Sequence, residues 1–238
     1  MLYIAIFSAL LPALMLVLYI FVRDKYQREP WREVLKAFGW GTLSVIPAIF
    51  IEVALQMTNI ITTEPQTIWQ SIWAAFAGAA FPEELSKMFV LWLFLSRSRY
   101  FDEYMDGIVY AVAVGMGFAG VENVFYILSN IGDWQSILVA RSLTSVPGHY
   151  MFAVAMGFFY SMASFYKPHY YAYALLIPIL LHGTYDALLF AMRVEGTSAW
   201  LLLMGFLVFF IFALVRAAKA IDVHLRTDLD IRRQQQST

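Results

Sequence analysis

The sequence predicts an all-α membrane protein, a polytopic helical bundle with about seven transmembrane helices. Composition is the first indication, because 61% of the 238 residues are hydrophobic and 14% are charged; soluble domains carry roughly 45–50% apolar and about 25% charged residues. Lipid solvates apolar surface that would form large exposed patches on a soluble protein. The second indication is a series of apolar runs, each close to the ~20 residues that cross a bilayer.

The first apolar run is expected to be a retained helix and not a signal peptide, because it has no basic start, is too long and lacks a small-residue cleavage site. We expect residues 1–221 to form one transmembrane domain and residues 222–238 to form a polar cytoplasmic tail. The seven predicted spans are 1–22, 37–57, 70–95, 106–129, 143–166, 170–192 and 198–217.

Basic residues predict the orientation of the bundle. The first, third and fifth loops and the tail together carry thirteen Lys and Arg residues, whereas the remaining loops carry only Arg141 and Arg193. Basic loops stay in the cytoplasm, so we expect the N-terminus outside, the C-terminus inside and the chain in a plasma membrane. The chain has no cysteine, which excludes disulfides and thiolate ligands. No nucleic-acid motif is apparent, and no nucleic-acid partner is expected.

Ionisable residues inside membrane spans are rare and mark functional sites by default. Two groups here have helical spacing, which places their members on one helix face: Glu83 and Glu84 with Lys87, and His182 with Asp186. The full set of such residues is Glu52, Glu83, Glu84, Lys87, Glu122, His149, His182 and Asp186.

These side chains are predicted to lie at similar depths in the membrane. Counted inward at 1.5 Å per residue, Glu122, His149 and Asp186 lie on the order of 10 Å from the outer surface, and His182 and Glu83 lie somewhat deeper. Four helices therefore place polar groups in one layer of the outer half of the membrane. Interior prolines, which leave a backbone carbonyl unpaired, occur beside this layer and indicate a water-filled cavity. They are Pro82, Pro147 and Pro178.

Two kinds of chemistry fit this set of residues. Adjacent carboxyls beside an ammonium can settle with one ionised and one protonated, which provides a base and an acid for activating water at a peptide carbonyl. Alternatively, Glu122, His149 and His182 provide nitrogen and oxygen ligands for a divalent metal such as zinc. The sequence leaves metal-dependent and metal-free mechanisms open. Outside this layer, Glu52 is expected at the membrane interface, and Asp106 and His224 are expected to be solvated.

At these residues the sequence resembles the PrsW family of intramembrane proteases, which are distant relatives of the CAAX prenyl endopeptidases. The motifs are Glu83-Glu84-Leu85-Ser86-Lys87, Phe118 to Glu122, Pro147-Gly148-His149, and His182 to Asp186. Asp24 with Glu29-Pro30, and Asp106-Gly107, also match the family pattern. The resemblance implies a prokaryotic membrane peptidase that cleaves an anti-sigma factor on its extracytoplasmic side.

The resemblance also implies roles for individual residues: Glu83 as general base, Glu84 as its support, and His182 with Asp186 for orientation or oxyanion binding. The expected function is hydrolysis of a peptide bond in a single-pass membrane protein within the bilayer, by a glutamic or a metal-dependent mechanism. The alternatives are a transporter or channel for a divalent cation or protons, and a scaffold or sensor without catalysis. A transporter would place polar residues at successive depths toward both faces of the membrane.

Overall fold

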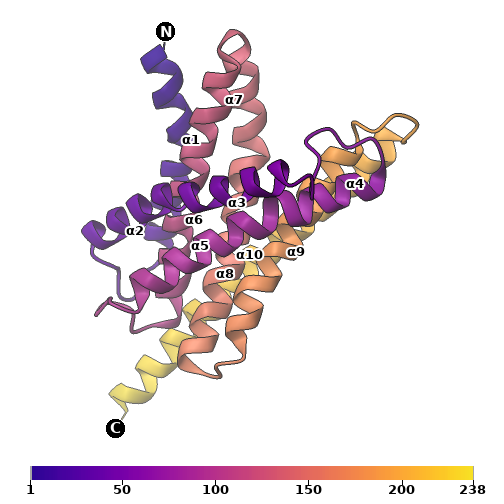
Figure 1. Cartoon of the computed structure of the whole chain (residues 1–238). Helices are drawn as coiled ribbons and strands as arrows, with labels where there is room; N and C mark the ends of the chain where they lie inside the picture. The colour runs from indigo at the N-terminus through magenta and orange to yellow at the C-terminus, as the bar shows by residue number, and fades with distance from the viewer. Residues whose placement is uncertain (1, 238) are drawn as a thin grey trace.

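The computed structural model describes residues 2–237, and every regular element within them is helical (Figure 1). The prediction of an all-helical membrane bundle is confirmed in this respect. The elements are α1 Leu2–Arg23, α2 Trp31–Leu43, α3 Val45–Met57, α4 Ile68–Trp73, the π-helical segment η1 Ala74–Ala80, α5 Phe81–Leu95, α6 Tyr104–Ser129, the short 3-10 turn η2 Ile131–Asp133, α7 Trp134–Leu143, α8 Ser145–Phe165, α9 Tyr170–Ala191 and α10 Ala199–Gln236.

Within residues 2–237, five helices are long and apolar enough to cross a membrane: Leu2–Arg23, Trp31–Met57, Tyr104–Ser129, Tyr170–Ala191 and Ala199–Gln236. The predicted spans 70–95 and 143–166 correspond to α4–η1–α5 and to α8. The first is divided into pieces that are individually too short, and α8 is long enough but less apolar. The count of seven spans and the orientation of the termini therefore stay predictions.

The second predicted span is broken at Ser44. Helix α2 ends at Leu43 and α3 starts at Val45, because Pro47 has no N–H to bond to the carbonyl of Leu43. The Ser44 hydroxyl donates to the Gly41 carbonyl at 2.6 Å and helps to close the end of α2.

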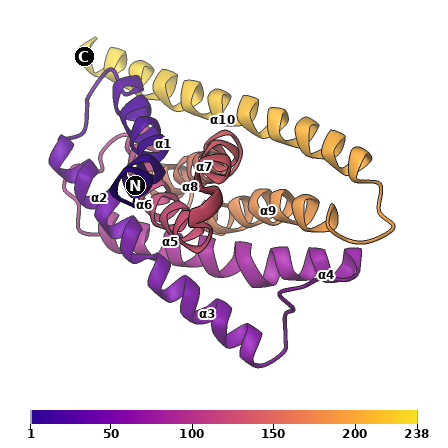
Figure 2. The ribbon, with the colours of Figure 1, turned by 90° about the horizontal axis from the view of Figure 1, so that it is seen from above.

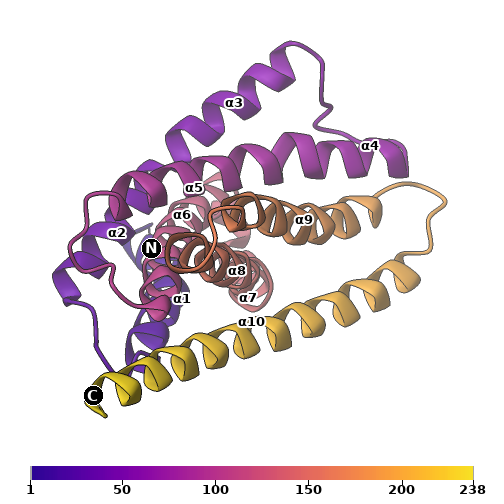
Figure 3. The same cartoon turned by 90° about the horizontal axis from the view of Figure 1, so that it is seen from below.

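Helix α6 forms the centre of the bundle. It packs against α8, α2 and α1, and 78% of its most apolar stretch is buried. Figure 2 shows α1, α6, α7 and α8 nearly end-on, with α10 along one side and α3 along the opposite side. Seen from below, α10 crosses the whole width of the molecule (Figure 3).

Small residues set how closely α2 approaches α6. A Cβ atom added at Gly41 would lie 2.0 Å from the carbonyl oxygen of Val114, and one added at Gly117 would lie 2.1 Å from that of Phe38. The two backbones are therefore in direct contact, a mode of packing that small residues permit in membrane helices. The glycines of α6 thus serve contacts with α1, α2 and α8.

A second polar region lies where α10 meets the start of α6. Asp228 caps α6, since its carboxylate accepts from the backbone N–H groups of Tyr104 and Met105, each at 2.9 Å. A carboxylate is stabilising at a helix N-terminus. His224 stacks on Phe158 at 4.2 Å and is 1% exposed. The expectation that His224 is solvated is therefore wrong, because α10 stays helical beyond His224 and packs against α8 at this residue.

Asp106 was also expected to be solvated, and this expectation is wrong as well. It is fully buried as the third residue of α6, where its carboxylate accepts from the N–H groups of Asp102 and Glu103 at 2.9 and 2.6 Å. Nearby, in the first loop, burial and then the charge of Glu29 raise the pKa of Asp24 to about 7. The acids of the family-like pattern in the first loop and in α6 therefore gather in one region.

The close contact of α2 and α6 predicts that Gly41→Ala destabilises the protein by about 1–3 kcal/mol, the usual cost of overpacking, because its Cβ would meet backbone that cannot move aside. Gly39→Ala is the matched control on the same helix, since nothing lies within 4 Å of its added Cβ. Thermal unfolding in detergent measures both variants. Equal melting temperatures for the two variants would contradict the backbone contact.

Candidate functional site

The paired glutamates follow a π-helical segment. The segment Ala74–Ala80 is alanine-rich, and Glu83 and Glu84 lie in the first turn of α5 that follows it. Pro82 lies at the start of α5, where the absence of an N–H is tolerated. A π-helical segment has an extra residue in its turn and often occurs at functional sites. The two acids therefore lie immediately after an irregular helical turn.

Helix α9 comes close to this segment because Gly183 has no side chain. An added Cβ there would lie 2.4–2.6 Å from ring atoms of Phe76. The neighbouring residue on α9 is His182, which faces the glutamates, so the close packing at Gly183 fixes the distance between the imidazole and the acids.

The ammonium of Lys87 holds both glutamates. Its Nζ lies 3.0 Å from Glu83 Oε2 and 2.8 Å from Glu84 Oε1, and 4.0 Å from the ring centroid of Phe118. All three charged residues are buried, with exposed fractions of 8% for Glu83, 0% for Glu84 and 3% for Lys87. The spacing in the sequence therefore corresponds to a real ion-paired triad.

His149 connects this triad to α6. Its Nδ1 lies 3.2 Å from Lys87 Nζ, and its Nε2 lies 2.7 Å from Glu122 Oε2. An ammonium can only donate, so Nδ1 accepts and Nε2–H donates to Glu122. The contacts thus select one neutral tautomer of His149, with its lone pair directed at the triad.

Arg141 of α7 completes this side of the network. Its Nη2 lies 3.0 Å from Glu122 Oε2, and its Nε donates to Asn123 Oδ1 at 2.6 Å. The guanidinium also stacks over Tyr126 at 3.8 Å. Arg141 therefore anchors the carboxylate that orients His149.

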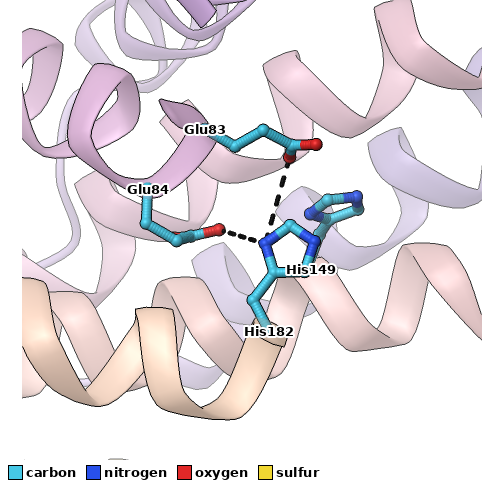
Figure 4. Close-up of side chains that lie close together, drawn as sticks. All are labelled: Glu83, Glu84, His149 and His182. Atoms are coloured by element: carbon cyan, nitrogen blue, oxygen red, sulfur yellow. Dashed lines mark hydrogen bonds and ion pairs between the residues drawn. The ribbon is translucent and has the colours of Figure 1, made fainter. Parts of the chain in front are cut away.

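His182 lies between two carboxylates. Its Nδ1 is 2.9 Å from Glu84 Oε1, and its Nε2 is 3.2 Å from Asp186 Oδ2. Both ring nitrogens can donate at once only when the ring is an imidazolium. The ring stacks on Phe152 at 4.8 Å. Figure 4 shows Glu83 and Glu84 reaching from one helix toward this ring, with His149 close to it.

Four side chains offer ligand atoms that all lie within 4.8 Å of one another: Glu83, Glu84, His149 and His182. Two carboxylates and two imidazoles form a donor set that suits zinc and similar ions. Glu84 Oε2 is buried and has no hydrogen-bond partner. A buried acceptor without a partner is unusual and is consistent with an additional ligand or water.

A cavity of about 650 Å³ reaches this cluster. Glu83 and Glu122 line it, together with Glu52 of α3, whereas Glu84 and His182 do not. A second cavity of about 810 Å³ shares Gln56 and residues 61–63 with the first. Both cavities therefore border the segment between α3 and α4, and the first of them is the hollow that reaches the cluster.

The structure brings all the sequence-predicted site residues together. Glu83, Glu84, His149 and His182 form the cluster, and Asp186 pairs with His182. Glu122, which was expected as a metal ligand with His149 and His182, lies outside this group of four and pairs with His149. The Glu122–His149 pair joins α6 and α8, so spacing within one helix did not reveal it. Arg141 was missed because a lone arginine in a short loop looks like a topology signal. Glu52 was expected at the membrane interface, yet it lines the cavity.

The sequence is similar to a known protein family and to individual proteins. Residues 29–215 match a family described as PrsW family intramembrane metalloprotease. The chain is 39% identical over 183 residues to Protease PrsW of Geobacillus kaustophilus, covering 76% of this chain and 77% of that protein. It is 34% identical over 228 residues to Protease PrsW of Bacillus subtilis, covering 93% and 98%. No solved structure matches significantly.

The network predicts that Arg141→Met destabilises the protein by roughly 3 kcal/mol, because removing one partner of a largely buried ion pair typically costs 3–5 kcal/mol and this side chain is 14% exposed. Arg193→Met is the control, since Arg193 is exposed and belongs to no described ion pair. Thermal unfolding in detergent measures the difference. An Arg141 variant as stable as the control would show that the guanidinium does not support Glu122.

Proposed function

The chain belongs to the PrsW family of intramembrane proteases, and from this premise we propose that it hydrolyses a peptide bond with Glu83 as general base. The observation that carries the proposal is the asymmetry of the glutamates. Glu83 lines the cavity, whereas Glu84 is fully enclosed behind it. A general base must reach a water at the substrate carbonyl, and of the two only Glu83 is placed to do so.

The neighbours of Glu83 have supporting roles in this proposal. Lys87 fixes both carboxylates, and Glu84 holds the Nδ1 side of His182 while Asp186 holds the Nε2 side. As an imidazolium, His182 uses both N–H groups on Glu84 and Asp186, so its proposed role is to orient the acids and to place a positive charge 4.0 Å from Glu83 Oε2. His149, oriented by Glu122, accepts from Lys87 and keeps the ammonium in place.

The proposed substrate is a single-pass membrane protein of the anti-sigma-factor type, cleaved near the extracytoplasmic side. Two observations support this position. The hollow that reaches Glu83 is lined by the segment between α3 and α4. The excess of basic residues in the alternate loops assigns that segment to the outside. The bacterial relatives and several apolar helices fit a multi-pass bacterial membrane protein.

The family description implies a metal ion, and the donor set fits one. Glu83, Glu84, His149 and His182 would hold it, and the unpartnered Glu84 Oε2 offers an additional acceptor. When bound, a divalent ion would polarise the peptide carbonyl and activate a water.

Lys87 competes with such an ion. Its ammonium lies within 3.2 Å of an atom on three of the four prospective ligands: Glu83, Glu84 and His149. Two cations in one small buried space repel each other strongly. A metal would therefore bind more weakly while Lys87 is present. In the absence of a metal, the ammonium of Lys87 neutralises the carboxylates.

A transporter is the competing function, and it would need polar residues toward both faces of the membrane. The second buried polar region, around Asp106 and Asp228, is therefore relevant to this alternative. Polar groups do lie toward both ends of α6. Between them, however, residues 111–116 of α6 are buried, and all but Gly115 are hydrophobic. This apolar barrier separates the two regions along α6, which favours a one-sided site.

Glu83→Gln is expected to lower cleavage by about 10²–10⁴-fold, the usual contribution of a general base, when the protein is reconstituted in liposomes with candidate single-pass substrates. Glu195→Gln is the control, because Glu195 is exposed and outside the hollow. Cleavage at the control rate by the Glu83 variant would contradict the proposal. Repeating the assay with a chelator separates metal-dependent from metal-free hydrolysis.

Lys87→Met is expected to make stability depend on metal. In the Lys87→Met variant without a metal ion, the buried carboxylates have no cation beside them, which lowers the free energy of unfolding by about 3–5 kcal/mol. Zinc at a hundredfold excess over Kd should then restore about 2.7 kcal/mol, visible as a higher melting temperature. Lys36→Met is the control, since Lys36 forms an exposed pair with Glu33. Zinc affinity equal to that of the unaltered protein would rule out competition by Lys87.

A further inference from the structure

A groove separate from the candidate site lies between α8, α9 and α10. It has a volume of about 430 Å³, and its walls are apolar except for two basic residues. The residues that form its aromatic and aliphatic walls include Phe158, Phe159, Ile177, Leu181, Phe212 and Val223. The two basic residues are Arg216 and Lys219 of α10.

Neither of these two cations belongs to an ion pair among the described residues, and both are exposed. Their neighbours on α10 differ, since Asp222 pairs with Arg23 at 2.5 Å and Arg232 pairs with Glu103 at 2.5 Å. Arg216 and Lys219 are three residues apart and therefore share a helix face. The groove thus presents two unneutralised positive charges partway along its length, between Phe212 and Val223.

The position of the two cations along α10 matches the level of lipid head groups. The last predicted span ends at residue 217, between them. Basic residues at this level, beside a gap between transmembrane helices, are typical of sites that bind anionic head groups. From there the apolar walls extend toward Phe212, into the apolar part of the span, and in the other direction past Ala220 to Val223.

The groove is too narrow for a helix. Phe212 and Val223 are eleven steps apart and therefore about 16 Å apart along α10, so a volume of 430 Å³ gives a mean cross-section of roughly 27 Å² over that length. A helix with its side chains is about 10–12 Å wide, which needs at least about three times this cross-section. A single hydrocarbon chain fits, whereas the transmembrane helix of a partner does not.

We propose that this groove binds one anionic phospholipid, with an acyl chain along the apolar walls and the phosphate between Arg216 and Lys219. The bound lipid would also contact α9 next to the residue that it contributes to the functional site. Leu181 lines the groove, and the next residue, His182, faces Glu84. The bound lipid would therefore brace α9 at the level where it presents its imidazole, and this holds whether or not the chain is a protease.

The test is native mass spectrometry of the full chain released from nanodiscs that contain phosphatidylglycerol or phosphatidylcholine with the same acyl chains. We expect one phosphatidylglycerol to be retained. The double variant Arg216→Gln/Lys219→Gln should bind it about 30-fold more weakly, at about fivefold for each lost cation. The control double variant Arg226→Gln/Arg233→Gln removes the same charge from exposed positions of α10 outside the groove and should retain the lipid.

A second variant tests the apolar part of the groove while keeping both cations. Ala220→Phe adds a ring at a half-buried lining position and should displace the lipid, with an unchanged melting temperature in detergent as the check on folding. Equal retention of phosphatidylcholine, or unchanged lipid binding in the Arg216/Lys219 variant, would overturn the proposal. A species of twice the chain's mass that Ala220→Phe abolishes would assign the groove to a second copy and would also overturn it.

Discussion

The contact of the Lys87 ammonium with Glu83 and Glu84 is the constraint on which the centre of this protein depends. Two adjacent carboxylates cannot be buried in a membrane bundle without a cation, because the desolvation cost of each ion is several kcal/mol. Lys87 provides that cation one turn away, at 3.0 and 2.8 Å. The aromatic ring of Phe118 and the lone pair of His149 surround the rest of the ammonium. Groups from three helices, α5, α6 and α8, therefore enclose this one charge.

The same network explains why the site is rigid on one side and open on the other. Arg141, Glu122 and His149 tie α7, α6 and α8 to the triad through contacts of 2.7–3.2 Å. Glu83, Glu52 and the cavity-facing part of Glu122 border a hollow of about 650 Å³. Water therefore has access to one carboxylate of the pair, while the other is held against His182. Such a division of environments is how two identical side chains acquire different chemical roles.

Much of this site could be predicted from the sequence, because pairs within one helix follow from spacing alone. Glu84 with Lys87, and His182 with Asp186, needed only the three- and four-residue rule. Contacts between helices were harder, since the rotation of each helix is set by packing. The depth count placed Glu122 and His149 in one layer but did not pair them, and it left Arg141 out. The π-helical segment was missed because an alanine-rich run such as Ala74–Ala80 looks like ordinary helix. The break at Ser44 was missed although Pro47, three residues later, is visible in the sequence.

The π-helical segment also decides which changes of chain length the protein tolerates. Each residue in an α-helix turns the chain by about 100°, and Ala74–Ala80 contains an extra residue in its turn. Deleting a single alanine would remove that extra residue and convert the segment into ordinary α-helix, with little change in the rotation of α4 relative to α5. The same deletion within α4 would rotate one part of the helix by about 100° relative to the rest, and the present contact of α4 with α9 would be lost. The alanine tract therefore tolerates the loss of one residue better than the α-helix beside it, because the π-helical turn absorbs the change of phase.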